Sequence, residues 1–262
     1  MKDKFKLGIV IFACDKIEKY REQVRTLRNT WVKKAKEFPD IKVLFFFGEE
    51  TTEEFTGEDY VNLKGVGDDC CSVHDKNYDG IKYFYDNYDC DFVYCCGTDT
   101  YINIPKLYKI IDNFNPADRL YIGGCGMNFT LGNNNYYFHS GGTGFILTKG
   151  VIADLVPLIN TTLFDDWDKL CKSYGNYEAS YLSDVSIGYF ARNVLKDVYT
   201  IDVENKVFYS DNYKHLSDGE REKSIICHFM QPQDVCDYDK IMEDNNFFLH
   251  NSAKINIQII PT

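Results

Sequence analysis

The sequence has no long hydrophobic run: no apolar stretch approaches the roughly 20 residues that a membrane-spanning helix requires. It also has no excess of positive charge, because its formal net charge is -11 and its pI is about 4.9. Nucleic acids and anionic membrane surfaces bind basic faces, so both are excluded as partners. An anionic ligand would need a metal ion or a local basic pocket here.

No two cysteines have the C-x-x-C spacing, although the chain contains 10 cysteines, so a structural zinc site has little support. Two pairs are vicinal, Cys70-Cys71 and Cys95-Cys96, and several other cysteines lie inside apolar runs. This arrangement favours reduced, mostly buried thiols over a disulfide framework.

The start of the chain offers two interpretations. Residues 1–13 followed by Cys14 resemble a short signal peptide with a lipoprotein-like cysteine. The apolar stretch is minimal, however, and it runs directly into an amphipathic helix that needs it as a neighbouring strand. We therefore expect a soluble, cytoplasmic protein without a membrane span.

The chain contains no internal repeat and no low-complexity linker, so we expect one domain over residues 1–262. Strand-like and helix-like segments alternate, which predicts a layered α/β fold. Asp15 is expected to cap the first helix, with Glu18 completing a capping-box pattern. The segment from about 231 to 262 has no regular pattern, and its packing stays open. Strands are expected at 6–13, 41–47, 91–96, 119–123, 143–148, 205–209 and 225–229, helices at 17–35, 73–88, 104–114, 151–159 and 183–196, and a hairpin over 127–138.

The most informative stretch is 91–103, where an apolar strand ends in Gly97-Thr98-Asp99 and resumes as Tyr101-Ile102. Ligands gather beyond the carboxyl ends of strands in α/β sheets. Asp99 could therefore hold a divalent cation that bridges diphosphate oxygens. Equally, Asp99 could only cap the helix that begins near Ile104.

A second stretch, residues 139–145, places Gly141, Gly142 and Gly144 between two strand-like segments. Glycines there let a ligand or a second backbone approach closely. No Gly-Lys-Ser/Thr follows, so this is not a Walker A loop, and no dinucleotide fingerprint follows the first strand. By itself the cluster is weak evidence for a ligand, because a plain tight turn is the more common explanation.

Two single residues complete the set. Asp184 opens a helix, where the dipole favours an ionised carboxylate, and at a pocket edge it could act as a general base. His228 ends an apolar strand and is either a core group or a ligand. Neither residue decides the function alone.

Together, the order and spacing of these elements resemble the Fringe-like β1,3-glycosyltransferases, the core 1 β1,3-galactosyltransferases in particular. The resemblance covers roughly residues 6–230. Its matching elements are Arg28-Asn29-Thr30-Trp31, the motif strand Phe92 to Ile102, Ser140 to Phe145, Asp184 to Tyr189, His228-Phe229, and a segment containing His74 and Lys82.

The resemblance implies a GT-A fold, a Rossmann-like three-layer sandwich with a mixed, mostly parallel sheet. It implies an inverting transferase that moves a hexose or N-acetylhexosamine from a UDP-sugar to a hydroxyl of a glycan or glycoprotein, in β1,3 linkage. Asp99 and His228 would bind Mn²⁺ or Mg²⁺, and Asp184 would be the base. The implied donor-binding residues are Arg25, Arg28, Lys82, Thr98, Asp99, Gly141, Gly142 and Gly144.

The match departs from the family at three positions. The family's Asp-Asp-Asp triplet is Gly97-Thr98-Asp99 here, and Ser183 replaces the first acid of a Glu/Asp-Asp pair. These losses motivate an alternative, a catalytically silent relative that binds a nucleotide sugar or a glycan.

Overall fold

The fold is built around a mixed central sheet, seen in a computed structural model that describes residues 2–49, 52, 54–69, 71–159, 161–244 and 256–260. In the described part of the chain the sheet has eight strands in the order β13-β10-β6-β9-β4-β1-β2-β3. Their bounds are β1 Asp3–Phe12, β2 Ile41–Phe47, β3 Tyr60–Asn62, β4 Tyr88–Gly97, β6 Leu120–Gly124, β9 Phe145–Thr148, β10 Tyr199–Val203 and β13 Ile257–Ile260.

Most strands of the central sheet run in the same direction. β3, β2, β1 and β4 are parallel neighbours, and β6 is parallel to β10. β9 runs antiparallel to both β4 and β6, and β13 runs antiparallel to β10. The central strands are apolar along their length because helices cover both of their faces. The carboxyl ends of β1, β4, β6 and β10 therefore meet at one edge, where β9 begins.

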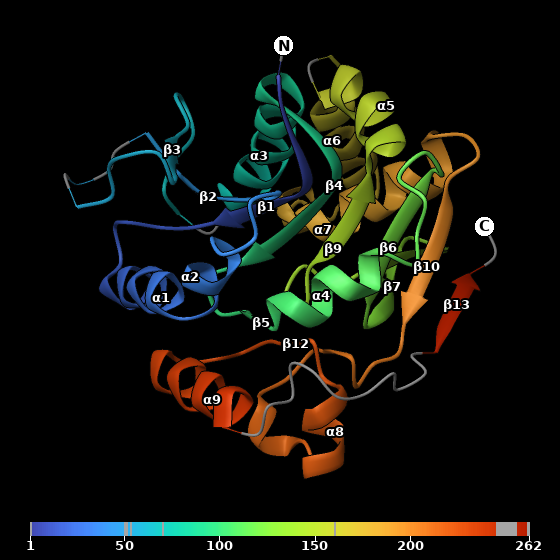
Figure 1. The fold of residues 1–262 in the computed structure, drawn as a ribbon. Helices are drawn as coiled ribbons and strands as arrows, with labels where there is room; N and C mark the ends of the chain where they lie inside the picture. Colours follow the sequence, from blue (N-terminus) through green and yellow to red (C-terminus); the bar gives the residue numbers. More distant parts are fainter. Residues whose placement is uncertain are drawn as a thin grey trace.

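Helices lie on both sides of this sheet (Figure 1). One side packs α3 (Val73–Asn87), α5 (Lys149–Ile159), α6 (Leu163–Ser173) and α7 (Ser183–Tyr189). The other packs α1 (Glu18–Asn29), α2 (Trp31–Ala35), α4 (Ile104–Ile111) and α9 (Pro232–Asp244). This layering confirms the predicted three-layer sandwich with a mixed, mostly parallel sheet.

Two small sheets stand at the carboxyl edge. β5 (Tyr101–Ile102), β12 (Ile226–Cys227) and β11 (Phe208–Tyr209) form one, and the hairpin of β7 (Gly126–Leu131) and β8 (Asn134–His139) forms the other. The short helices of the remaining chain are η1 Glu178–Tyr181, the π-helical turn η2 Phe190–Val194, η3 Tyr213–His215 and α8 Asp218–Lys223.

Three expectations about local structure were wrong. The first helix begins after Ile17 without a side-chain cap, because the buried Asp15 carboxylate instead accepts from the Thr52 N–H. That helix is also broken at Thr30, which separates α1 from α2. The strand expected at 205–209 is only β11, whereas the sheet strand β10 lies earlier, at Tyr199–Val203.

The predicted helix at 183–196 divides into α7 and the π-turn η2, after which the backbone is extended at Leu195. In η2 the Leu195 N–H donates to the Phe190 carbonyl at 2.8 Å, which is an i to i+5 hydrogen bond. The apolar spacing of the segment predicted an α-helix throughout and gave no sign of this change.

The segment left open by the sequence contributes α9, which packs against α1, and β13, which pairs with β10. Residues 245–255 and 261–262 of that segment lie outside the described residues, as does Cys70. The cysteines that the structure describes are free thiols, and five of them are buried. Among the described helices, none combines the length and the apolar character that crossing a membrane requires.

Candidate active site

Asp99 and His228 are brought together at the carboxyl edge of the sheet. Asp99 follows the end of β4, and β12 runs antiparallel to β5 with Cys227 opposite Tyr101, so His228 lies back towards Asp99. The His228 Nε2 atom is 3.4 Å from the Asp99 Oδ1 atom, and the Met230 N–H donates to the Asp99 carbonyl at 3.0 Å. Both side chains are partly exposed, so a ligand can reach them.

The alternative role of Asp99, as a helix cap, is excluded. Helix α4 is capped by Asn103, whose side-chain oxygen accepts from the Lys106 N–H at 3.2 Å. The loop carrying Asp99 is instead held from below, because the buried Trp31 indole donates to the Thr100 carbonyl at 3.1 Å. The Trp of the Arg-x-Thr-Trp element therefore supports the loop of the Asp-rich motif.

The glycine turn, defined here as Gly141 to Gly144, lies against this pair. A Cβ atom on Gly142 would stand 2.1 Å from the His228 Cε1 atom, so any side chain there would displace the imidazole. Thr100 donates to the Gly142 carbonyl at 2.9 Å. Gly144 has a φ of +71°, and its Cβ would meet the Tyr94 hydroxyl oxygen at 2.4 Å. These glycines are needed because the backbone passes directly over the side chains of His228 and Tyr94.

Asp184 lies on the other side of the same turn. Its Oδ2 atom accepts from the Gly141 N–H at 2.8 Å, and its Oδ1 atom accepts from the Val185 N–H at 2.9 Å. Burial raises the pKa of the Asp184 carboxyl above the ordinary aspartate range, although these N–H groups oppose the shift. A carboxylate that holds a proton more tightly is a stronger base towards a hydroxyl group.

The two positions where the chain departs from the Asp triplet have structural counterparts. A Cβ atom on Gly97 would lie 3.1 Å from both the Asp99 Oδ1 atom and a ring carbon of Phe12. Phe12 therefore occupies part of the space that an acid at position 97 would need. Thr98 is buried and donates to the Gln23 side-chain oxygen at 2.6 Å, so its hydroxyl is engaged with α1.

The cations predicted for the donor are not brought together with Asp99. Arg25 forms ion pairs with Glu18 and Glu54, with its Nε atom 2.5 Å from a Glu54 oxygen. These contacts, first of all the Arg25 hydrogen bond, lower the pKa of Glu54 to about 2. The exposed Arg28 guanidinium lies 5.4 Å from the ring centroid of Tyr60.

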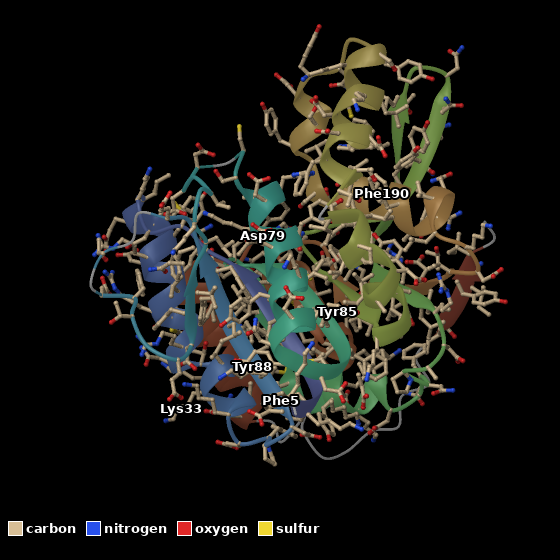
Figure 2. All side chains as sticks on the ribbon, turned by 90° about the horizontal axis from the view of Figure 1, so that it is seen from above. Phe5, Lys33, Asp79, Tyr85, Tyr88 and Phe190 are labelled. Atoms are coloured by element: carbon tan, nitrogen blue, oxygen red, sulfur yellow. The ribbon has the colours of Figure 1, made fainter. Side chains whose placement is uncertain are left out.

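Lys82 pairs with Asp86 in the second half of α3. Because α3 ends at Asn87 and β4 begins at Tyr88, this half of the helix lies towards the amino end of β4, away from Asp99. A cavity of about 390 Å³ at that amino end, lined by Tyr85, Tyr88 and Lys149 among others, is likewise distant from the candidate site. Figure 2 shows Tyr88 in the lower half of the view and Phe190 in the upper half.

Sequence reasoning missed a buried ion pair at the carboxyl ends of β1 and β2. The Lys76 ammonium contacts the Asp68 carboxylate and donates to the Ala13 carbonyl at 2.7 Å. Asp68 also accepts from the N–H groups of Asp15 and Gly48. Burial alone would raise the pKa of Asp68, but these donors outweigh it and hold the pKa below the ordinary range.

A sequence signal for Lys76 did exist. Lys76, Gly80 and Phe84 recur at four-residue spacing and share the buried face of α3. A lysine on such a face needs a buried partner.

In layered α/β folds, ligands bind at the carboxyl edge of the sheet, which is where Asp99, His228 and the glycine turn lie. A family model described as Fringe-like matches residues 6–203, which is more than half of the chain. The chain belongs to the Fringe-like family, and it is therefore a glycosyltransferase with the predicted GT-A class of fold.

No curated protein matches the chain. Among solved structures, galactosyltransferase LgtC with donor and acceptor sugar analogues is 12% identical, with a TM-score of 0.49 over 89% of this chain and 95% of that one. Apo GlyE of Streptococcus pneumoniae TIGR4 is 13% identical, with a TM-score of 0.49 over 94% of this chain and 63% of that one. A glycosyltransferase involved in glycosylating the major capsid of PBCV-1 is 12% identical, with a TM-score of 0.44 over 90% and 98%. The family assignment rests on the family model alone.

Proposed function

We propose that the protein is an inverting, metal-dependent transferase that moves a hexose or N-acetylhexosamine from a UDP-sugar to an acceptor hydroxyl, in β1,3 linkage. The observation that carries this proposal is the glycine turn, whose Gly142 lies on His228 while its neighbour Gly141 binds Asp184. A candidate metal-binding pair and a candidate base thus flank two consecutive residues.

The pair Asp99 and His228 fits a divalent cation that is shared with a ligand. Within the described residues, no group of three or more His, Cys, Asp and Glu side chains is placed to hold a metal ion. One carboxylate and one imidazole suit Mn²⁺ or Mg²⁺ when phosphate oxygens complete the coordination. When bound, such an ion supplies positive charge next to the leaving diphosphate.

The chain's own residues perform the remaining steps. The glycine turn leaves room for the donor sugar to lie against backbone. The Asp184 carboxylate accepts the proton of the acceptor hydroxyl as that oxygen forms its bond to the anomeric carbon. The bond between that carbon and the diphosphate oxygen breaks in the same step, with UDP leaving on the opposite side, so the configuration inverts.

The experiment that tests this proposal is a thermal-shift series of UDP-sugars with Mn²⁺, with Mg²⁺ and with EDTA. A ligand at 100 times its Kd stabilises the folded state by about 2.7 kcal/mol. We expect at least one UDP-sugar to raise the Tm with metal only, and the shift to vanish in Asp99→Ala and His228→Ala. Asp86→Ala, at the amino end of β4, is the control and should keep the shift.

Two outcomes would change the conclusion. No shift with any UDP-sugar would contradict the UDP-dependent reaction. A metal-dependent shift without turnover of donor, with or without acceptor, would instead establish the silent sugar-binding relative that the losses at Gly97 and Thr98 suggest.

A further inference from the structure

A second cluster of polar side chains lies beyond the glycine turn, at the carboxyl ends of β6 and β10. It consists of Tyr137 on β8, Arg192 in η2 and Asp202 on β10, with His139 beneath them, and is called the β6–β10 cluster below. The Arg192 guanidinium lies 5.0 Å from the ring centroid of Tyr137, and the Tyr137 hydroxyl hydrogen-bonds Asp202. Tyr137, Arg192 and Asp202 are each partly exposed, so solvent and ligands can reach them.

His139 closes the cluster from below and is fully buried. Its ring is 5.7 Å from the Tyr137 ring, and its Nδ1 atom is 3.8 Å from the Asp202 Oδ1 atom. Among the described residues, neither ring nitrogen of His139 nor this Asp202 oxygen makes a well-formed hydrogen bond, although the His139 ring lies near the backbone of Tyr121 and Ile201. A buried polar atom without a hydrogen bond costs about 1–3 kcal/mol, so a ligand or a water molecule that met these atoms would be favoured.

The backbone around the cluster is irregular in two places. Cys125, between β6 and β7, has a φ of +52°, which is strained for a residue with a side chain. Arg192 lies in the π-turn η2, and π-turns within helices occur frequently at functional sites. Figure 2 shows Phe190, the first residue of this turn, at the base of the protruding lobe that contains the β7–β8 hairpin and α6.

The cluster is next to Asp184 on the side away from the metal-binding pair. β8 ends at His139, and Gly141, two residues later, donates to Asp184. Helix α7 begins with Ser183 and Asp184 and continues directly into η2, which carries Arg192. The two elements that carry Tyr137 and Arg192 therefore both lead from the cluster to the backbone around Asp184.

The chemistry of the cluster fits a neutral sugar. Asp202 accepts hydrogen bonds from sugar hydroxyls, and the Arg192 guanidinium donates to hydroxyl or ring oxygens. The two charges cancel, so neither an acidic nor a basic ligand is favoured. Tyr137 holds both side chains in position through its ring and its hydroxyl.

We propose that the β6–β10 cluster is the acceptor subsite, where Arg192 and Asp202 bind the hydroxyl groups of a neutral pyranoside whose reacting hydroxyl faces Asp184. The reaction itself rests on the function proposed above, whereas the binding of a pyranoside does not. Arg192 and Asp202 would then determine which acceptor is bound.

The test measures binding of methyl β-glycosides of glucose, galactose, N-acetylglucosamine and N-acetylgalactosamine to the full chain by saturation-transfer NMR, with UDP and Mn²⁺ present. We expect at least one glycoside to bind, and Asp202→Asn and Arg192→Gln each to weaken it about tenfold, since each removes a hydrogen bond to a charged group. The surface pair Arg119–Asp154 offers a matched control, and Asp154→Asn should bind like the wild type.

The same samples separate this inference from the proposed reaction. Unchanged donor-induced thermal shifts show that the variants are folded, and Tyr137→Phe, which removes only a hydroxyl, provides a milder variant with a smaller loss. If no glycoside binds the wild type, or if all variants bind as the wild type does, the subsite is overturned while donor binding can still stand. If the variants lose glycoside binding but no UDP-sugar binds, the subsite stands and the proposed reaction falls.

Discussion

The buried polar groups on the two sides of the glycine turn differ in how far they are paired with opposite charges or hydrogen-bond donors. At the carboxyl ends of β1 and β2, the Asp68 carboxylate is met by Lys76 and by backbone N–H groups, and its pKa is lowered. On the acceptor side, burial raises the pKa of Asp184 and of Asp202, and His139 is buried as a neutral ring. The first arrangement pairs its buried charge, while the second holds titratable groups that are only partly paired, at a cost in stability.

This difference suggests a division of labour. Around Asp68, a buried charge is balanced by an opposite charge and by backbone donors. A site that must bind and activate a variable partner keeps groups whose hydrogen-bonding capacity is still available.

The largest expected effect is that of Asp184→Ala on transfer. Removing the general base should lower kcat by about 10²–10⁴-fold, while the donor-induced thermal shift persists because Asp184 lies across the turn from His228. UDP release with acceptor measures the rate. Asp218→Ala, at the start of α8, is the control, since Asp218 is also in the first turn of a helix. A variant at Asp184 with near-normal turnover would remove the base from the mechanism.

Next is Lys76→Met, which leaves the buried Asp68 carboxylate without its cation. We expect a loss of about 3–5 kcal/mol in the free energy of unfolding, measured by urea denaturation. The double variant Asp68→Asn/Lys76→Met should recover part of this loss because no buried charge remains. A loss below about 1 kcal/mol would show that the Lys76–Asp68 pair contributes little to the free energy of unfolding.

A smaller effect is expected from Gly142→Ala. The added methyl group would stand 2.1 Å from the His228 ring, and such overpacking costs about 1–3 kcal/mol. The metal-dependent donor shift should weaken together with the Tm. Gly150→Ala is the control, since its Cβ would meet no atom closer than 3.4 Å. Equal Tm values and equal donor shifts for the two variants would contradict the contact between the glycine turn and the His228 imidazole.

The smallest expected effect concerns acid and His139. Burial, with a contribution from Arg192, lowers the pKa of His139 to about 3, whereas its ordinary value is 6.5. As the pH falls below 6.5, His139 therefore becomes protonated in the unfolded chain but stays neutral in the folded chain. The free energy of unfolding decreases as a result. Between pH 7 and pH 5.5 we expect the wild type to lose about 1 kcal/mol more than His139→Gln. Parallel pH profiles of unfolding for the two proteins would disprove this.

The sequence predicted the layered fold well where strands are continuous apolar runs, as in β1, β2 and β4. It failed at β10, because that strand is only partly buried and carries Asp202 among its apolar residues. It failed again at Thr30 and at η2, since each of these changes spans only a few residues, too few to alter an apolar pattern read over a whole helix.

For the candidate site, motif order predicted the proximity of Asp99, His228 and the glycine turn. The cationic side chains for the donor were harder to predict, because the charge of a side chain does not show which group it pairs with. Arg25 and Lys82 have acidic neighbours that satisfy them, while Lys76 is hidden on a helix face. The residues of the β6–β10 cluster come from three separate elements, so no local sequence pattern predicts that they lie together.

The π-turn at Phe190–Val194 has a consequence for how this family member could change over time. Such a turn is equivalent to an α-helix with one residue inserted, and each residue advances a helix by about 100°. A one-codon deletion there would restore the α-helical phase and turn Arg192 away from Tyr137, while Asp184, upstream in the same helix, would keep its place. A single genetic step of this kind could exchange one acceptor for another without touching the chemistry.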